Sequence, residues 1–350
     1  MARHGAVGID IGSAAIKVVE LSGDGQGTDG GGSAVRAVAS ASTPAGTMEE
    51  GRITDVQAVG RVLRDLVQGA GIRTRHAVTA VNGQVALMRE VRMPQLPPEE
   101  IRQAARFEVE RYLPYPIAEV TFDTVVVGES REGGNGRVDV LVVAARTDVL
   151  RHHAAALQAA GLDPAVVEVE PLAVARAVSS RATPDQVTAC VHLGSSVTMI
   201  LVIEGEAPRV IRTVAFGTTQ LLEAAAARLG ATGEAPEVLQ ARLAAAGNGD
   251  VPGLREAIDD SLSSLVTEIR RSLEYYGGRY RAIVPDRVVV TGGGAALPGL
   301  TASLGSALDL PVELGDPFAD LGGFPKKGQA ESGAAYAVAA GLARRGVDEP

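Results

Sequence analysis

The chain has 350 residues, 46% of them hydrophobic and 21% charged, and a formal net charge of −9 at pH 7, which allows two or three domains with substantial cores. No apolar run approaches the roughly 20 residues of a membrane-spanning helix, and residues 1–4 leave no room for a signal peptide before the first strand pattern, so we expect a cytosolic protein. The acidic balance and the lack of tryptophan argue against a nucleic-acid-binding protein, and the single cysteine, Cys190, excludes internal disulfides and cysteine-ligated metals.

The first 83 residues have the pattern of half an α/β domain. Two β-rich runs, 6–11 and 15–21, flank a Gly-Ser turn and predict a hairpin. A glycine-rich loop at 23–33 and a further strand at 35–39 follow. An amphipathic helix over 55–70 and a strand at 76–81 complete the pattern.

Residues 84–162 have a different order of elements and predict a separate α+β subdomain. A strand at 88–93 leads into a helix over 101–113, which begins after two prolines and ends before Pro114. Strands at 120–127 and 138–144 flank a glycine-rich turn at 133–136, and a helix over 148–160 ends the insertion.

The remaining chain repeats the pattern of the beginning. A strand at 166–169 and a helix over 170–178 precede a second hairpin, 187–203, which again has a glycine directly after its first strand. A strand at 209–214 follows, and the stretch 221–280 is mostly helical, with a break at glycines 247–249 and a predicted cap at Gly277-Gly278. A third glycine cluster follows the strand at 287–290. After a helix over 300–308 and a strand at 312–314, a helix of small residues, 333–343, is expected to bridge two domains.

The two hairpin turns predict a pair of phosphate-binding sites. A tight glycine turn points backbone N–H groups outward and forms a nest for phosphate oxygens. Asp10 is placed to hold the hydration shell of Mg²⁺, whereas Lys17 either approaches a terminal phosphate or lies along the strand edge. The side chains after the two glycines permit close approach of a ligand: Ser13, Ala14, Ser195 and Ser196.

These motifs resemble those of the actin/Hsp70/sugar-kinase superfamily. Residues 8–13 (GIDIGS) resemble its phosphate 1 motif, 193–196 (LGSS) its phosphate 2 motif, and 292–300 its adenosine motif. Residues 170–175 and the helix 333–341 resemble its two interdomain connections. The five motifs occur in the superfamily's order, which implies an α/β, actin-like (ribonuclease H-like) two-domain ATPase fold that binds ATP or ADP with Mg²⁺.

Within the superfamily, the resemblance is strongest to the PilM family of type IV pilus proteins. It is carried by 10–21 (DIGSAAIKVVEL), 89–116, 268–276 (EIRRSLEYY) and 316–318 (DPF). It implies a 1C-type α+β subdomain insertion and the following division of the chain: subdomain 1A, 1–83 and 163–185; 1C, 84–162; 2A, 186–220 and 285–330; 2B, 221–284; and a C-terminal helix packing on 1A, 331–350.

The resemblance also implies the ligand-binding residues. Around the phosphates these are Asp10, Gly12, Ser13, Ala14, Lys17, Gly194, Ser195, Ser196 and Gly217. Around adenine and ribose they are Glu268, Arg271, Ser272, Gly292, Gly293, Gly294 and Leu297. Asp10 would bind the metal, and Glu170 is the candidate for orienting an attacking water.

One position departs from the family pattern. His192 stands where the phosphate 2 motif usually has an aspartate. A neutral imidazole is a poor partner for the hard Mg²⁺ ion, and an imidazolium would repel it. We therefore expect slow or absent ATP hydrolysis, and two interpretations of His192 stay open: a hydrogen-bonded strand histidine or a phosphate ligand.

The family resemblance implies a cytoplasmic scaffold of a type IV pilus or related secretion machine. It would bind ATP between its domains and recruit the cytoplasmic N-terminal peptide of a PilN-like inner-membrane protein, with residues 88–110 as a wall of the groove between 1C and 1A. Other components of the inner-membrane platform are expected partners, and neither nucleic acid nor direct membrane insertion is expected. The protein would thus associate with the inner membrane only through its partners.

Two alternatives from other functional classes stay open. An FtsA-like filament protein of cell division needs a C-terminal amphipathic anchor, for which residues 341–350 have few bulky apolar side chains. A small-molecule kinase of the same superfamily needs a general base in the N-terminal domain, and no such residue is obvious.

Overall fold

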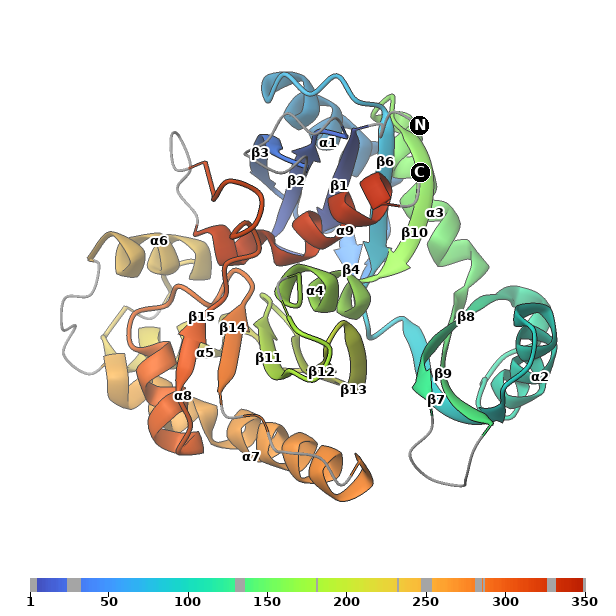
Figure 1. Ribbon diagram of the computed structural model, residues 1–350. Coiled ribbons are helices and arrows are strands. Elements are labelled where there is room, and N and C mark those ends of the chain that lie inside the picture. The colour runs from blue at the N-terminus through green and yellow to red at the C-terminus, as the bar shows by residue number, and fades with distance from the viewer. Residues whose placement is uncertain are drawn as a thin grey trace.

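The computed structural model describes residues 5–23, 33–129, 136–180, 182–231, 233–246, 254–280, 285, 287–325 and 332–348. The glycine-rich segments predicted at 23–33, 133–136 and 247–249 lie wholly or largely outside these residues. Figure 1 shows two sheets with a layer of helices between them and a smaller sheet at one side.

The first sheet has five strands in the order β10-β6-β1-β2-β3. β1 and β2 form the predicted hairpin, β3 extends it antiparallel, and β6 and β10 join on the other side in parallel. The strands are β1 (Ala6–Ile11), β2 (Ala15–Leu21), β3 (Val35–Ser42), β6 (His76–Val81) and β10 (Asp163–Val169).

The second sheet repeats this topology strand for strand. Its order is β13-β12-β11-β14-β15, with the same succession of antiparallel and parallel pairs. The duplication predicted from the two hairpins is therefore confirmed. The strands are β11 (Val187–Leu193), β12 (Thr198–Glu204), β13 (Ala207–Val214), β14 (Val288–Thr291) and β15 (Val312–Leu314).

Helices cover the outer face of each sheet. On the first sheet, α1 (Val56–Gly69) and α3 (Thr147–Ala159) pack over the strand residues that point outward. The Asp55 carboxylate begins α1 by accepting a hydrogen bond from the Ala58 amide, 2.9 Å. On the second sheet the covering helices are α5 (Thr218–Arg228), α6 (Pro236–Ala246), α7 (Leu254–Tyr280) and α8 (Leu300–Leu308).

Two helices, α4 (Glu170–Val178) and α9 (Ala337–Asp348), form the central layer between the sheets (Figure 1). A Cβ atom at Gly8 would lie 1.9 Å from the Ala339 carbonyl oxygen, and one at Gly341 would lie 1.9 Å from the Ala173 carbonyl oxygen. Backbone therefore lies directly on backbone at both crossings, which explains the small residues of α9. A 3-10 turn, Gly333–Tyr336, leads into α9.

The insertion forms a small sheet with its own core. Its strand order is β7-β9-β8, and α2 packs on one face through Ile101, Ala105 and Val109. The elements are β7 (Ala86–Pro94), α2 (Pro98–Glu110), a 3-10 turn (Ile117–Glu119), β8 (Val120–Glu129) and β9 (Arg137–Arg146). Because α3 packs on α1 instead, we propose that subdomain 1C ends near Arg146.

Two further details complete the fold. A two-residue hairpin, β4 (Met48–Glu49) with β5 (Arg52–Ile53), precedes α1. The cap predicted at Gly277-Gly278 is wrong, because α7 continues through both glycines to Tyr280. Within the described part of the chain, no helix combines the length and the apolar character that crossing a bilayer requires.

His153 on α3 makes the stability of the fold sensitive to acid. Its side chain is buried, and both ring nitrogens lack a hydrogen-bond partner among the described residues. Burial, and then the charge of His152, lower the pKa of His153 from 6.5 to about 4. Between these two pH values the unfolded chain binds a proton that the folded chain does not, so the free energy of unfolding falls as the pH is lowered.

We expect His153→Leu to remove this dependence. Urea denaturation gives the unfolding free energy of each protein at pH 7.5 and at pH 4. As the pH is lowered over this range, the wild type should lose up to about 3 kcal/mol more unfolding free energy than the variant. Gln158→Leu, on the exposed side of α3, should keep the wild-type slope. Equal slopes for wild type and His153→Leu would contradict the assignment.

Candidate functional site

The turns of the two long hairpins have the same backbone geometry. The Gly12 amide donates to the Ala15 carbonyl oxygen at 3.1 Å, and the Gly194 amide donates to the Val197 carbonyl oxygen at 2.9 Å. A Cβ atom at either glycine would lie 2.9 Å from that same acceptor. Each turn is thus closed so tightly that only glycine fits at its first position.

The fold brings these two turns into contact. The Ser13 hydroxyl lies 2.6 Å from the Ser195 hydroxyl and 3.2 Å from the Ser196 hydroxyl, across 182 and 183 positions of sequence. Predicted phosphate residues of both domains, Ser13 with Ser195 and Ser196, therefore lie side by side. A phosphate chain between the turns would require them to separate.

Four titratable side chains from both domains gather below the turns. Asp10 and Lys17 are directly opposite each other in the β1–β2 register, Glu170 is the first residue of α4, and His192 lies near the end of β11. Burial, and then the charge of Asp10, raise the pKa of the Glu170 carboxyl well above its usual range, while Lys17 opposes the shift. These groups are thus electrostatically coupled across the domain boundary.

The second hairpin lacks the charges of the first. In its register His192 is opposite Met199, where the first hairpin has Asp10 opposite Lys17. His192 is buried, and its Nδ1 forms a 3.0 Å hydrogen bond with the Thr291 hydroxyl. Burial, and then Lys17, lower the pKa of His192 to about 3, so the ring is neutral at pH 7. The strand-histidine interpretation has a physical basis in this hydrogen bond.

The N-terminus of α5 supports the second turn. The Gly194 carbonyl oxygen accepts hydrogen bonds from the Thr218 amide, 2.9 Å, and hydroxyl, 3.1 Å. A Cβ atom at Gly217 would lie 2.3 Å from the Ser195 carbonyl oxygen. The close approach brings the positive end of a helix dipole beside the predicted phosphate site.

The third glycine cluster packs on the same turn. Gly292 has a left-handed φ of +93°, and the Gly294 amide donates to the Leu193 carbonyl oxygen at 3.1 Å. Leu297 is buried in the core of the second domain. From α6, the Gln240 side-chain amide donates to the Gly293 carbonyl oxygen at 2.9 Å. Sequence reasoning missed Gln240, because no local pattern indicates which helix lies over this turn.

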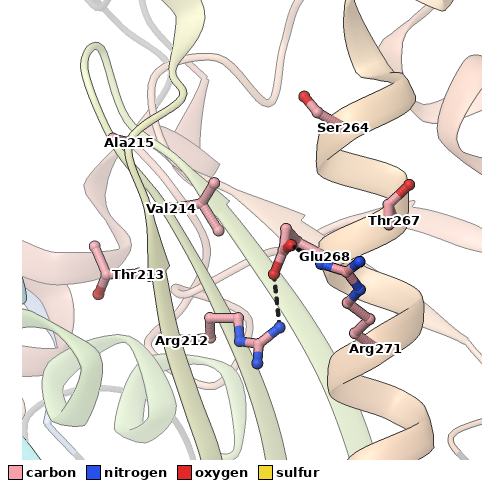
Figure 2. A pocket seen from close by; sticks show the side chains of 8 residues that line it. All are labelled: Arg212, Thr213, Val214, Ala215, Ser264, Thr267, Glu268 and Arg271. Atoms are coloured by element: carbon pink, nitrogen blue, oxygen red, sulfur yellow. Dashed lines mark hydrogen bonds and ion pairs between the residues drawn. The ribbon is translucent and has the colours of Figure 1, made fainter.

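Glu268 and Arg271 line a separate groove, shown in Figure 2. Glu268 accepts hydrogen bonds from Arg212 at 2.6 Å and from Arg271 at 2.8 Å, within a cavity of about 630 Å³ between β13 and α7. The groove lies at β13, and the glycine cluster follows β14, three strands away in the same sheet. The strands are connected through the pairings Arg212–Ile200, Ile200–Val191 and Val191–Val290. Three strand spacings amount to roughly 14 Å.

The other predicted residue of α7, Ser272, is buried. Its hydroxyl donates to the Glu268 carbonyl oxygen at 2.8 Å, within the helix. The structure therefore does not bring the predicted adenosine face of α7 together with Gly292, Gly293 and Gly294. It brings α6 there instead.

The carboxylates at the site fit a magnesium ion whose remaining ligands come from a bound nucleotide and water. Among the described residues there is no group of three or more histidines, cysteines, aspartates or glutamates that would hold a metal unaided. Mg²⁺ bound with a nucleotide needs only one or two carboxylates, because phosphates and water complete its shell. Asp10 and Glu170 are two buried carboxyl groups close enough to perturb each other.

Comparisons with known proteins agree with this geometry. A family model described as type IV pilus assembly protein PilM matches residues 8–347. The chain is similar to a solved structure described as a PilM–PilN type IV pilus biogenesis complex, with 31% sequence identity, 99% of both chains covered and a TM-score of 0.83.

More distant structures share the fold alone. One is the ethanolamine utilization protein EutJ from Carboxydothermus hydrogenoformans, with 16% identity over 98% of this chain and 90% of that one, and a TM-score of 0.60. Another is MreB5 of Spiroplasma citri bound to AMPPNP, with 11% identity over 97% and 94% and a TM-score of 0.52. The chain therefore has the predicted actin-like α/β fold and belongs to the PilM family of type IV pilus assembly proteins.

Proposed function

We propose that this protein is a nucleotide-binding adaptor that holds a PilN-like membrane protein in a type IV pilus machine. The observation that carries the proposal is the similarity over 99% of the chain to a structure described as a PilM–PilN complex. In this proposal the protein works at the cytoplasmic face of the inner membrane and associates with it only through its partners.

The proposed nucleotide site is the space between the two hairpin turns. The turns carry backbone amides and hydroxyls from Ser13, Ser195 and Ser196. Such donors suit phosphate oxygens. Because the turns now touch, ATP binding would change the angle between the domains, and this change would tune the affinity for the partner.

Asp10 and Glu170 would hold the Mg²⁺ that accompanies the nucleotide, and the ion would supply charge neutralisation at the phosphates. Glu170 is also the group that would orient an attacking water. His192, which occupies the position of Asp10 in the second hairpin, is neutral and adds no negative charge to the site. Hence we propose that ATP is bound and hydrolysed slowly or not at all.

The proposed partner surface lies on subdomain 1C. Four of the seven large apolar side chains exposed in the described part of the chain belong to it: Phe107, Tyr112, Val125 and Val126. Their number on this small subdomain supports the proposal that it carries an interaction surface. The β7/α2 seam, lined by Leu87, Arg89, Val91, Glu108, Val109, Tyr112 and Val142, overlaps the predicted wall at residues 88–110.

The partner surface can be tested with Phe107→Ser. The Phe107 side chain is 69% exposed on α2, so we expect the fold to be unaffected. Affinity for the N-terminal peptide of the PilN-like protein should fall about tenfold or more, as for an aromatic hot spot, measured by fluorescence anisotropy. Leu314→Ser, at an exposed site of the second domain, serves as the control. Unchanged affinity in both variants would remove Phe107 from the interface.

The nucleotide site can be tested by placing a negative charge on the second turn. Ser196→Asp should weaken ATP binding at least about tenfold, because a carboxylate next to the phosphates repels them by more than about 1.4 kcal/mol at the effective dielectric near a protein surface. Calorimetric titration gives the affinity. Ser306→Asp, on the exposed surface of α8, should bind ATP as the wild type does. Wild-type affinity in Ser196→Asp would refute this location.

His192→Asp tests the explanation for slow hydrolysis. An aspartate would give the second hairpin the carboxylate that Mg²⁺ prefers, so we expect a Mg²⁺-dependent rise in phosphate release above the wild-type rate. His192→Asn provides the uncharged control and should remain at the wild-type rate. Rapid hydrolysis by the wild type itself would contradict the role given to His192.

A further inference from the structure

Subdomain 1C contacts the second domain directly, at some distance from the hairpin turns. Strand β8 approaches β13, and Glu90 on β7 reaches the C-terminal end of α7. Glu90 and Arg279 are 189 positions apart in sequence. The contact therefore arises from the tertiary fold. It joins the proposed partner-binding subdomain to the proposed nucleotide-binding domain.

Both oxygens of the Glu90 carboxylate are used in this contact. Oε1 accepts a hydrogen bond from Arg279 Nη2 at 2.5 Å, and Oε2 accepts one from the Tyr280 hydroxyl. The side chains of Glu90 and Arg279 are 15% and 26% exposed, so solvent screens the pair less than an ion pair on the open surface. We call Glu90, Arg279 and Tyr280 the latch.

The surroundings hold the latch in one arrangement. The guanidinium groups of Arg279 and Arg209 lie 5.6 Å and 5.7 Å from the centre of the Tyr280 ring. Arg209 is itself paired with Glu204 at 3.1 Å. A Cβ atom at Gly128 of β8 would lie 2.6 Å from Arg209 Nη2, so β8 and the Arg209 side chain are in close contact at this point.

The latch lies between the two proposed binding regions. Side chains alternate between the two faces of a strand, and on β7 Leu87, Arg89 and Val91 face the seam with α2 while Glu90 faces the second domain. On the other side, β13 pairs with β12, the second strand of the hairpin whose turn carries Ser195 and Ser196. A shift of α7 or β13 would thus act on the strand that forms the seam.

We propose that the latch transmits the state of the second domain to the partner surface of 1C, an inference that rests on the proposed nucleotide and peptide binding. With the latch closed, β7 is fixed to α7, and the seam senses the angle between the domains. Without it, 1C keeps its own core but moves independently of the second domain.

Peptide binding measured with and without ATP and Mg²⁺ tests the coupling. In the wild type, the ratio of the two dissociation constants should be about fivefold or more, the range of ordinary allosteric coupling. In Glu90→Gln and in Arg279→Met the ratio should fall to within about twofold of unity. Glu119→Gln, an exposed position of the same subdomain outside residues 88–110, should retain the wild-type ratio.

A distance measurement tests the latch without any ligand. Spin labels at Val126→Cys on β8 and Leu314→Cys on β15, both exposed, report the separation of 1C from the second domain. The distribution should be narrow in the wild type and broader in Glu90→Gln. Tyr280→Phe, which removes the hydroxyl but leaves the Glu90–Arg279 ion pair in place, should be intermediate.

The outcomes separate the two levels of the proposal. Latch variants that keep both the wild-type ratio and the narrow distribution would overturn the latch. A wild-type chain whose peptide affinity ignores ATP would overturn the transmission. If the wild type binds no peptide, the proposed function fails, and the distance distributions still decide whether Glu90 holds 1C in place.

Discussion

The direct backbone contact of α9 with β1 and with α4 is the constraint on which the rest of the structure depends. Side chains at Gly8 or Gly341 would collide with carbonyl oxygens of the neighbouring element. Because these crossings are so close, both sheets can pack on one shared layer of two helices. As a result, the turns of the two equivalent hairpins lie next to each other, and Ser13 contacts Ser195.

Within this near-symmetric frame, the chemistry is asymmetric. Both turns are closed by a glycine amide in the same way, and so either can present backbone donors to an anion. The charged pair Asp10–Lys17 occurs only in the first hairpin, whereas the second has His192 bonded to Thr291. This asymmetry supports the proposal that the protein holds a nucleotide rather than cleaving it, since recognition needs hydrogen-bond donors but hydrolysis also needs carboxylates that hold the metal.

Subdomain 1C, which carries the proposed partner surface, contacts the second domain directly. Strand β7 belongs to the small core of 1C on one face and meets the second domain through Glu90 on the other. The long helix α7 crosses the second domain and ends at that contact. A partly buried charge pair in which both carboxylate oxygens accept a hydrogen bond is a specific connection, because losing one partner leaves the other uncompensated.

Local patterns alone determined much of this protein: the two hairpins, the glycine turns, the amphipathic helices and the small-residue helix, because each depends on residues adjacent in sequence. The family motifs added the order of the domains. Tertiary structure decided the rest. Burial of Tyr276 and Tyr280 carries α7 through two glycines, each costing only about 1 kcal/mol in a helix. Likewise, α3 packs on α1 rather than on the sheet of the insertion. The same holds for the contacts of Gln240 with Gly293 and of Glu90 with Arg279, since each joins segments far apart in sequence that no local periodicity relates.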